Sequence, residues 1–191
     1  VLHRPAWALR VLLGASVTHG TLAMLDRPQW LWLADLAAML AAGRLSWLWW
    51  NRSAIDNRML AVLHVAFAWV APAFALFALQ SLLWTTMPGL LGQAPLHALT
   101  LGFFASMLLG MASRVTLGHS GQPVAADRVM WTAFRIMQGA AILRVASELP
   151  ALPGAHVLMW LSSVLWLGAF ALWAGRYAPA FWRPRSDGRS G

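Results

Sequence analysis

The sequence has no cysteine, no lysine and few acidic residues, and each absence narrows the chemistry open to it. Without cysteine there is no disulfide, no thiolate metal ligand and no covalent attachment of a c-type haem. Histidine and methionine are then the side chains left for binding soft or borderline metals. The fourteen basic residues are all arginine and outnumber the six acidic ones, which gives a formal net charge of +8.

The sequence also lacks the patterns that mark common catalytic sites. It has no glycine-rich phosphate loop, no nucleophile with an evident base and no pair of catalytic carboxylates. These absences argue against a hydrolase and against a nucleotide-driven pump. Positive charge can indicate nucleic-acid binding in a soluble protein, but here the arginines lie between hydrophobic runs, so no nucleic-acid partner is expected.

Long hydrophobic runs are what the sequence does have. Hydrophobic residues make up 60% of the 191 and charged residues only 10%, which is too apolar for one soluble core to hide. Six runs reach the roughly 20 apolar residues that cross a hydrocarbon core of about 30 Å. We therefore expect a single all-α polytopic membrane helix bundle with about six transmembrane helices in the lipid bilayer. The predicted spans are near residues 6–25, 30–50, 59–84, 96–117, 129–149 and 155–177.

The arginines predict the orientation of this bundle. With six crossings, most arginines fall at one face, whereas Arg27 alone lies in a connection at the other face. Because cytoplasmic connections are enriched in arginine, both termini are expected to be cytoplasmic. The arginines at the predicted cytoplasmic face are Arg4, Arg10, Arg44, Arg52, Arg58, Arg114, Arg128, Arg176, Arg183, Arg185 and Arg189.

Glycine and proline predict local features of two spans. The helix near 96–117 is expected to end at Gly118, where a left-handed C-terminal cap fits. Small residues four apart on one face of this helix would let a neighbouring helix approach closely. These residues are Gly102, Ser106 and Gly110. In the span near 59–84, Pro72 is expected to kink the helix.

Several short segments resemble the signature of a known family. Residues 114–121 read Arg-Val-Thr-Leu-Gly-His-Ser-Gly, and residues 97–100 before them read His-Ala-Leu-Thr. Residues 63–64 read Leu-His, and residues 183–191 read Arg-Pro-Arg-Ser-Asp-Gly-Arg-Ser-Gly. Together they resemble the NnrS family, membrane proteins that carry haem and copper and act in the response to nitric oxide. Members usually have a basic residue after the Gly-His-Ser/Thr-Gly turn, where this chain has Gln122.

The resemblance extends from about Met59 to the C-terminus and implies a function. It implies haem b and copper as cofactors, nitric oxide as a ligand, and a role in nitrosative stress or denitrification in the bacterial inner membrane. NnrS-like chains have about twice as many spans, so this chain, which does not begin with Met, is expected to be the C-terminal half of a longer protein. The N-terminal half would then be a further partner. An enzymatic reaction is left open, and a non-enzymatic role is favoured.

Three histidines match positions of the resemblance and are the preferred ligands for haem iron and copper: His64, His97 and His119. A neutral imidazole suits both metals. At about 1.5 Å rise per residue, His97 and His119 lie roughly 33 Å apart on one helix, so they cannot bind the same metal. His64 and His119 fall at the same membrane face and are expected to share a site. The alternatives are packing or hydrogen bonding for His64 and His97, and helix capping for His119.

Arginine is expected to bind the carboxylates of the haem, because a guanidinium matches a carboxylate in a bidentate fork. Arg114 and Arg144 are the candidates. The alternative for Arg144 is an ion pair with Glu148, which follows it by one helical turn.

The other histidines are weighed by their depth in the membrane. His19 and His156 lie at the depth of His97, so either of them could complete a pocket with it. His3 lies in the N-terminal tail and is not expected to bind a metal.

Two other classes of function remain open at this stage. One is a b-type cytochrome subunit in electron transfer, and the other is a non-catalytic transporter or structural bundle. Visible absorption of the purified protein separates the haem proteins from the third class. A stable nitrosyl complex without quinone-linked reduction separates the NnrS-like function from the electron-transfer subunit.

Overall fold

The computed structural model describes residues 5–50, 56–150, 152–186 and 188. Within these ranges every regular element is a helix and no strand is present, which confirms the expected all-α class. The α-helices are α1 (Ala6–Met24), α2 (Leu31–Trp49), α4 (Arg58–Ala68), α5 (Val70–Leu82), α6 (Ala94–His97), α7 (Ser106–His119), α8 (Arg128–Ala146) and α9 (Ala155–Tyr177). Two 3-10 helices, η1 (Pro28–Trp30) and η3 (Ala178–Phe181), and a π-helix, η2 (Ala98–Ala105), complete the set.

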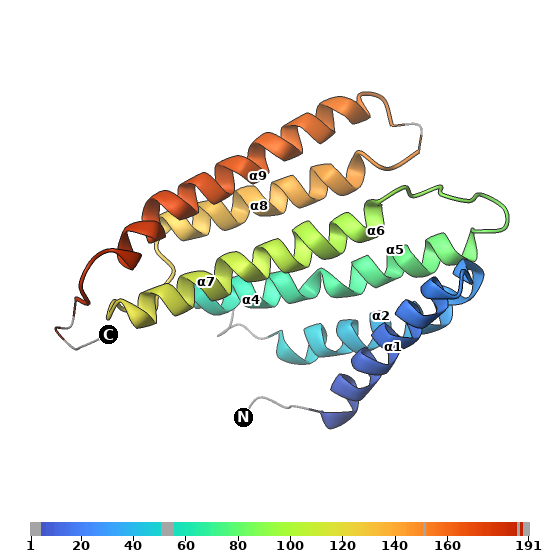
Figure 1. Cartoon of the computed structure of the whole chain (residues 1–191), viewed down its shortest axis with the longest axis horizontal. Helices are drawn as coiled ribbons and strands as arrows, with labels where there is room; N and C mark the ends of the chain where they lie inside the picture. The colour runs from blue at the N-terminus through green and yellow to red at the C-terminus, as the bar shows by residue number, and fades with distance from the viewer. Residues whose placement is uncertain (1–4, 51–55, 151, 187, 189–191) are drawn as a thin grey trace.

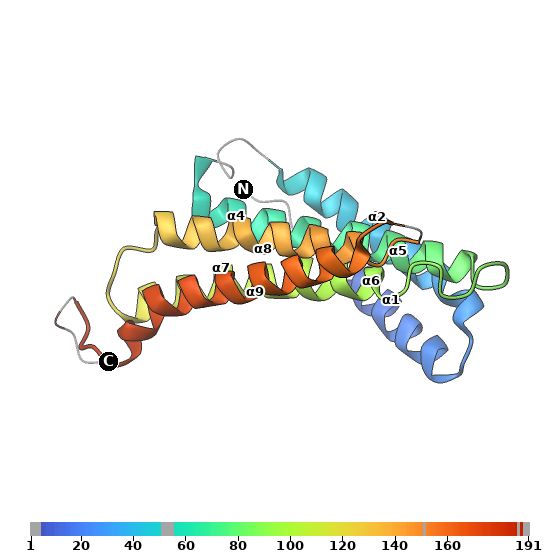
Figure 2. The same cartoon turned by 90° about the horizontal axis from the view of Figure 1, so that it is seen from above.

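The helices form a row of antiparallel rods in chain order (Figure 1). Helices α4 and α5 make one broken rod, and α6, η2 and α7 make another. Each rod packs against its neighbours in the sequence: α1 against α2, α2 against α5, α4 against α7, and α8 against both η2 and α9. Helix α1 is inclined to the other rods in both views (Figures 1 and 2). It packs on α2 and lies away from α8 and α9, so side chains on α1 do not contact those on α8 and α9.

All six predicted spans coincide with helices, and four of these are long and apolar enough to cross a membrane. These four are Pro28–Trp49, Arg58–Leu82, Ala94–His119 and Ala155–Phe181. Helices α1 and α8, with 19 residues each, are not among these four, and α8 carries Arg128, Arg135 and Arg144. The structure thus supports a membrane bundle, while the count of six crossings stays a prediction.

The antiparallel order gathers most of the described arginines at one end of the bundle, where α1, α4 and α8 begin and α2, α7 and α9 end. Arg4, Arg52 and Arg189, which the sequence also assigned to this face, lie outside the described residues. Arg144 lies near the opposite end, close to the C-terminus of α8. We call the first end the arginine-rich end; that it faces the cytoplasm stays a prediction.

The expected kink at Pro72 is present, and the expected cap at Gly118 is wrong. Helix α4 ends at Ala68 and α5 begins at Val70, because the ring nitrogen of Pro72 cannot donate to the carbonyl of Ala68. Helix α7 continues to His119, and the left-handed residue is Gly121, with φ 72°.

The turn after α7 has the hydrogen bonds of a Schellman motif. Gln122 N–H donates to Leu117 O at 3.0 Å, and Gly121 N–H donates to Gly118 O at 3.3 Å. The predicted type of cap was therefore right and its position was three residues too early.

The small-residue face predicted on the fourth span packs closely against α4 and the α4–α5 junction. A Cβ on Gly102 would collide with the Trp69 ring, and one on Gly110 would lie 2.8 Å from Val62 Cγ1. Ser106 is fully buried between these glycines. The predicted close approach is confirmed.

A chain of polar side chains crosses the interior where the α4–α5 rod breaks. Trp69 Nε1–H donates to Gln138 Oε1 at 2.8 Å, and Gln138 Nε2–H donates to Ser106 Oγ at 2.6 Å. Polar groups inside a membrane are costly unless they are paired. These bonds therefore fix how α8 packs against the α4–α5 rod and the α6–α7 rod.

Candidate functional site

Three charged or titratable side chains meet where α6, η2 and the end of α8 come together. His97, the last residue of α6, has Nε2 3.5 Å from Glu148 Oε1. Arg144 Nη1 lies 2.6 Å from the same oxygen, so the expected ion pair between Arg144 and Glu148 is present. The other carboxylate oxygen accepts a hydrogen bond from Gln93 N–H at 3.1 Å. Glu148 thereby joins two residues that the sequence proposed separately, His97 and Arg144.

These three side chains are largely removed from solvent, with exposed fractions of 19% for His97 and Glu148 and 21% for Arg144. His97 Nε2 is buried and makes no hydrogen bond with any described residue. Glu148 lies two residues beyond the end of α8, where its carboxylate contacts the Arg144 guanidinium and the Gln93 N–H.

Arg144 also lines a groove between η2 and α9. The groove has a volume of about 420 Å³, and its lining is mostly apolar. The lining residues are Leu101, Arg144, Ser162, Ser163, Trp166 and Leu167. The Ser162 hydroxyl donates to Ala140 O at 2.8 Å, so its donor is already used. A guanidinium beside an apolar groove suits a flat apolar molecule that carries a carboxylate.

His64 lies in a second groove, near the arginine-rich end. Its Nδ1 is 2.9 Å from Leu60 O, one turn earlier in α4. A carbonyl can only accept, so Nδ1 carries the proton and Nε2 keeps a lone pair. The groove is lined by Trp49, Leu63, His64, Phe67 and Met107, and its volume is about 220 Å³.

The predicted shared site of His64 and His119 is neither formed nor tested by the described contacts. His119 ends α7 and is exposed, as is Arg114 one turn earlier. Neither lines the groove of His64, and no described contact joins the two histidines. The sharing of one cofactor by His64 and His119, with Arg114 as a carboxylate partner, stays a prediction.

The histidines weighed by depth have different surroundings. His156 lies at the start of α9 and is exposed. His3 lies outside the described residues. His19 Nδ1 is 2.6 Å from Asp35 Oδ1, and the His19 ring packs edge-on against Phe77 at 5.2 Å between centroids.

The pair of His19 and Asp35 is the feature that sequence reasoning missed. Asp35 is fully buried between α1 and α2, and its Oδ2 has no hydrogen-bond partner among the described residues. A lone carboxylate in an apolar run was the available signal, because such groups are costly in a membrane and need a partner. The sequence alone did not identify the partner, since the pairing depends on how α1 crosses α2.

The described residues contain no group of three or more His, Cys, Asp or Glu side chains able to hold a metal ion. Among the described histidines, His19 and His97 each lie beside one carboxylate.

Comparison with known proteins decides the family. The family model described as NnrS protein matches residues 1–185. The chain belongs to the NnrS family. The match includes the N-terminal region, which the resemblance from residue 59 onwards did not cover. No curated protein and no solved structure matches the chain.

Two segments that carry the NnrS resemblance meet in space although they are far apart in the sequence. Ser186, in the C-terminal segment, donates from both its N–H and its hydroxyl to Ser120 O, each at 3.0 Å. Ser120 belongs to the Gly-His-Ser-Gly turn that closes α7. In this NnrS protein the C-terminal segment therefore folds back over the turn.

Proposed function

We propose that this NnrS-family chain binds haem b in the bacterial inner membrane, with His64 as an axial ligand, and acts in the response to nitric oxide. The observation that carries the proposal is the hydrogen bond from His64 Nδ1–H to Leu60 O at 2.9 Å. An axial histidine usually donates its second ring N–H to a carbonyl or carboxylate, which fixes the ring and leaves Nε2 for the iron.

The groove beside His64 offers an apolar surface of the kind that a porphyrin face packs against. Trp49 and Phe67 lie together there, with ring centroids 5.3 Å apart, and Leu63 and Met107 complete an apolar lining. The chain's residues would orient the imidazole and exclude water from one face of the group. Bound haem would supply an iron that takes nitric oxide as a ligand.

His97 is the second candidate ligand. It lies near the opposite end of the bundle from His64, so the two histidines would serve separate sites. Arg144 contacts Glu148 beside His97 and lines the groove between η2 and α9, so it is the candidate partner for a haem carboxylate there. The Nε2 atom of His97 lies 3.5 Å from Glu148 Oε1 and makes no hydrogen bond among the described residues.

Copper, the inner-membrane location, the cytoplasmic termini and nitric oxide as the ligand are proposals that rest on the family and on the arginine pattern. For copper we assign no ligand set, because the described chain holds no group of three His or carboxylate side chains. The NnrS-like role is preferred to that of an electron-transfer subunit or a transporter on the family match.

The absorption spectrum of the purified protein tests the proposal. After expression with added haem precursor, the wild type is expected to show the Soret band of a b-type haem. The His64→Ala variant is expected to lose most of that band, because the iron loses its axial ligand. His156→Ala is the matched control, since His156 is exposed at a helix end, and it should keep the wild-type spectrum.

Three results would contradict the proposal. The absence of haem from a folded wild type would favour a transporter or structural bundle. Equal spectra for the wild type and His64→Ala would remove His64 as the ligand. Reduction of the haem by quinol, without a stable nitrosyl complex, would instead favour an electron-transfer subunit.

A further inference from the structure

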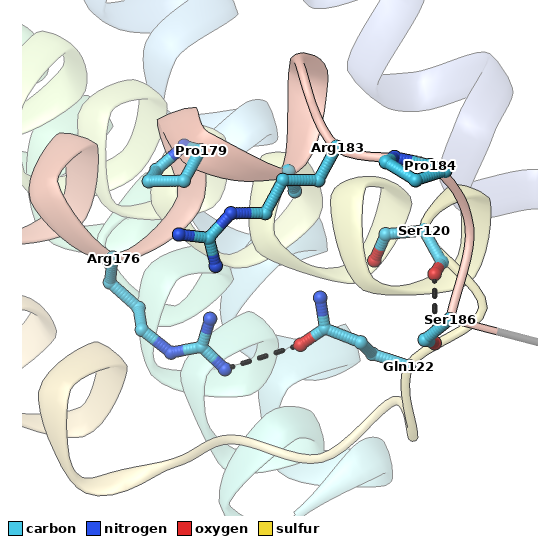
Figure 3. A pocket seen from close by; sticks show the side chains of 8 residues that line it. Ser120, Gln122, Arg176, Pro179, Arg183, Pro184 and Ser186 are labelled. Carbon is cyan, nitrogen blue, oxygen red and sulfur yellow. Dashed lines mark hydrogen bonds between the residues drawn. The ribbon is translucent and has the colours of Figure 1, made fainter.

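A polar pocket lies at the arginine-rich end, where the C-terminal segment covers the turn after α7. Its volume is about 330 Å³. It is lined by Ser120, Gln122, Arg176, Pro179, Ala180, Arg183, Pro184 and Ser186. Figure 3 shows the guanidinium groups of Arg176 and Arg183 reaching into the same space from different elements. Two guanidinium groups that converge on one pocket favour an anion with several oxygen atoms.

One of these guanidinium groups is held in position. Arg176 Nε–H donates to Asp127 Oδ2 at 2.6 Å, and its Nη2 donates to Gln122 Oε1 at 3.4 Å. Asp127 in turn caps α8 by accepting from Met130 N–H at 2.8 Å. Arg176 thus joins α9 to the start of α8 and to the turn after α7.

The second guanidinium group is free to bind. Among the residues that the structure describes, Arg183 makes no hydrogen bond and no ion pair, and its side chain is exposed. Asp127 balances the charge of Arg176, so the charge of Arg183 is left without a counterpart in the pocket lining. The pocket therefore has a net positive charge and an unused donor group.

The residues next to Arg183 indicate where the anion comes from. Phe181 and Trp182 are 68% and 80% exposed, at the end of a membrane helix. Aromatic side chains in such positions lie at the headgroup level of a bilayer, which places the pocket at the depth of lipid phosphates. Basic pockets between membrane helices bind the headgroups of anionic lipids.

We propose that this pocket binds the phosphate of an anionic phospholipid headgroup, with Arg176 and Arg183 as its ligands and Phe181 and Trp182 as interfacial anchors. The bound lipid would hold the C-terminal segment against the turn after α7. None of the pocket's lining residues lines the groove of His64 or the groove of Arg144.

Native mass spectrometry of the full chain, released from detergent with mixed lipids, tests this proposal. The wild type is expected to retain phosphatidylglycerol in preference to phosphatidylcholine. Arg183→Gln is expected to reduce this preference about fivefold, the effect of one arginine at an anionic membrane surface. Arg183→Lys should keep most of it, because the charge remains. The control is Arg128→Gln, since Arg128 is exposed at the same end but does not line the pocket.

Three results would overturn the proposal. The first is equal retention of phosphatidylglycerol by the wild type and Arg183→Gln when both proteins have the same helical circular dichroism. The second is a loss of phosphatidylglycerol in Arg128→Gln equal to that in Arg183→Gln, which would show a general effect of charge. The third is that excess inorganic phosphate displaces the lipid and itself binds in a way that depends on Arg183. Free phosphate would then be the ligand. Retention in the presence of phosphate is the expected outcome.

Discussion

The partner of each imidazole decides what that imidazole can do. His64 donates a hydrogen bond from Nδ1–H to Leu60 O, which leaves the lone pair on Nε2 of the neutral ring. His97 lies beside a carboxylate that already holds a guanidinium. His19 is hydrogen-bonded to Asp35, which is fully buried, so its partner is a polar group inside the bundle. Three similar residues in apolar helices thus have three different chemical environments.

The cluster around His97 gives a prediction on cofactor content. Replacing His97 by Ala is expected to lower the amount of bound haem or copper, because one candidate ligand is lost, without preventing membrane insertion. Metal analysis and absorption of the purified variant measure this. Arg144→Gln should also lower the amount of bound haem, because the haem carboxylate loses its guanidinium partner. Unchanged metal content and spectra in His97→Ala would leave His97 as a packing residue.

The pair of His19 and Asp35 gives a prediction on stability. His19→Ala leaves a fully buried carboxylate without a partner, which costs about 3–5 kcal/mol in the free energy of unfolding. Changing both residues to Leu removes the buried charge as well and should recover most of that loss. Thermal unfolding in detergent, followed by circular dichroism, compares the two variants. A His19→Ala protein as stable as the wild type would show that the pair is not needed.

At the scale of the helices, sequence reasoning identified where each rod lies in the sequence but not which type of helix forms each part of it. The hydrophobic runs located all six rods, and Pro72 located the break between α4 and α5. The π-helix η2 was not predicted, because the apolar pattern of residues 98–105 fits an α-helix equally well. Glu148 was expected to pair with Arg144 within α8, whereas its contact with His97 depends on the packing of α6 against α8.

The close packing of α7 on α4 gives a prediction with an internal control. Gly110→Ala places a methyl group 2.8 Å from Val62 Cγ1, and Val62 is fully buried and cannot move aside. Overpacking of this kind costs about 1–3 kcal/mol. Gly118→Ala lies on the same helix with nothing within 4 Å of its new Cβ, so it should be neutral or stabilising. Equal unfolding temperatures for the two variants would contradict the packing.

At the scale of the whole molecule, the row of rods separates its polar features instead of gathering them in one site. The groove of His64 and the pocket of Arg183 lie toward the arginine-rich end, whereas His97, Glu148 and Arg144 lie toward the other. Depth along the membrane was predictable from the sequence by counting residues. Distance across the row was not, and this is why His19 was considered a partner for His97 although α1 packs away from α8.

The topology gives a prediction for the whole chain. With six crossings, a reporter fused to the C-terminus and one inserted in the connection at residues 85–93 should lie on opposite sides of the membrane. The C-terminal reporter should be cytoplasmic, because the arginine-rich end is expected to face the cytoplasm. Paired alkaline phosphatase and fluorescent protein fusions measure both positions. Reporters on the same side would require α8 to lie outside the membrane or the order to be different, whereas α1 precedes both reporters and does not affect their relative sides.

The central claim is that His64 holds a haem that binds nitric oxide, and the electron paramagnetic resonance spectrum of the ferrous nitrosyl complex tests it most directly. With an imidazole opposite the nitric oxide, the signal carries hyperfine splitting from the imidazole nitrogen, and labelling the histidines with ¹⁵N changes that splitting. The account predicts a label-sensitive signal in the wild type, its loss in His64→Ala and its return when imidazole is added. A nitrosyl signal that is the same in His64→Ala and in the wild type would contradict it.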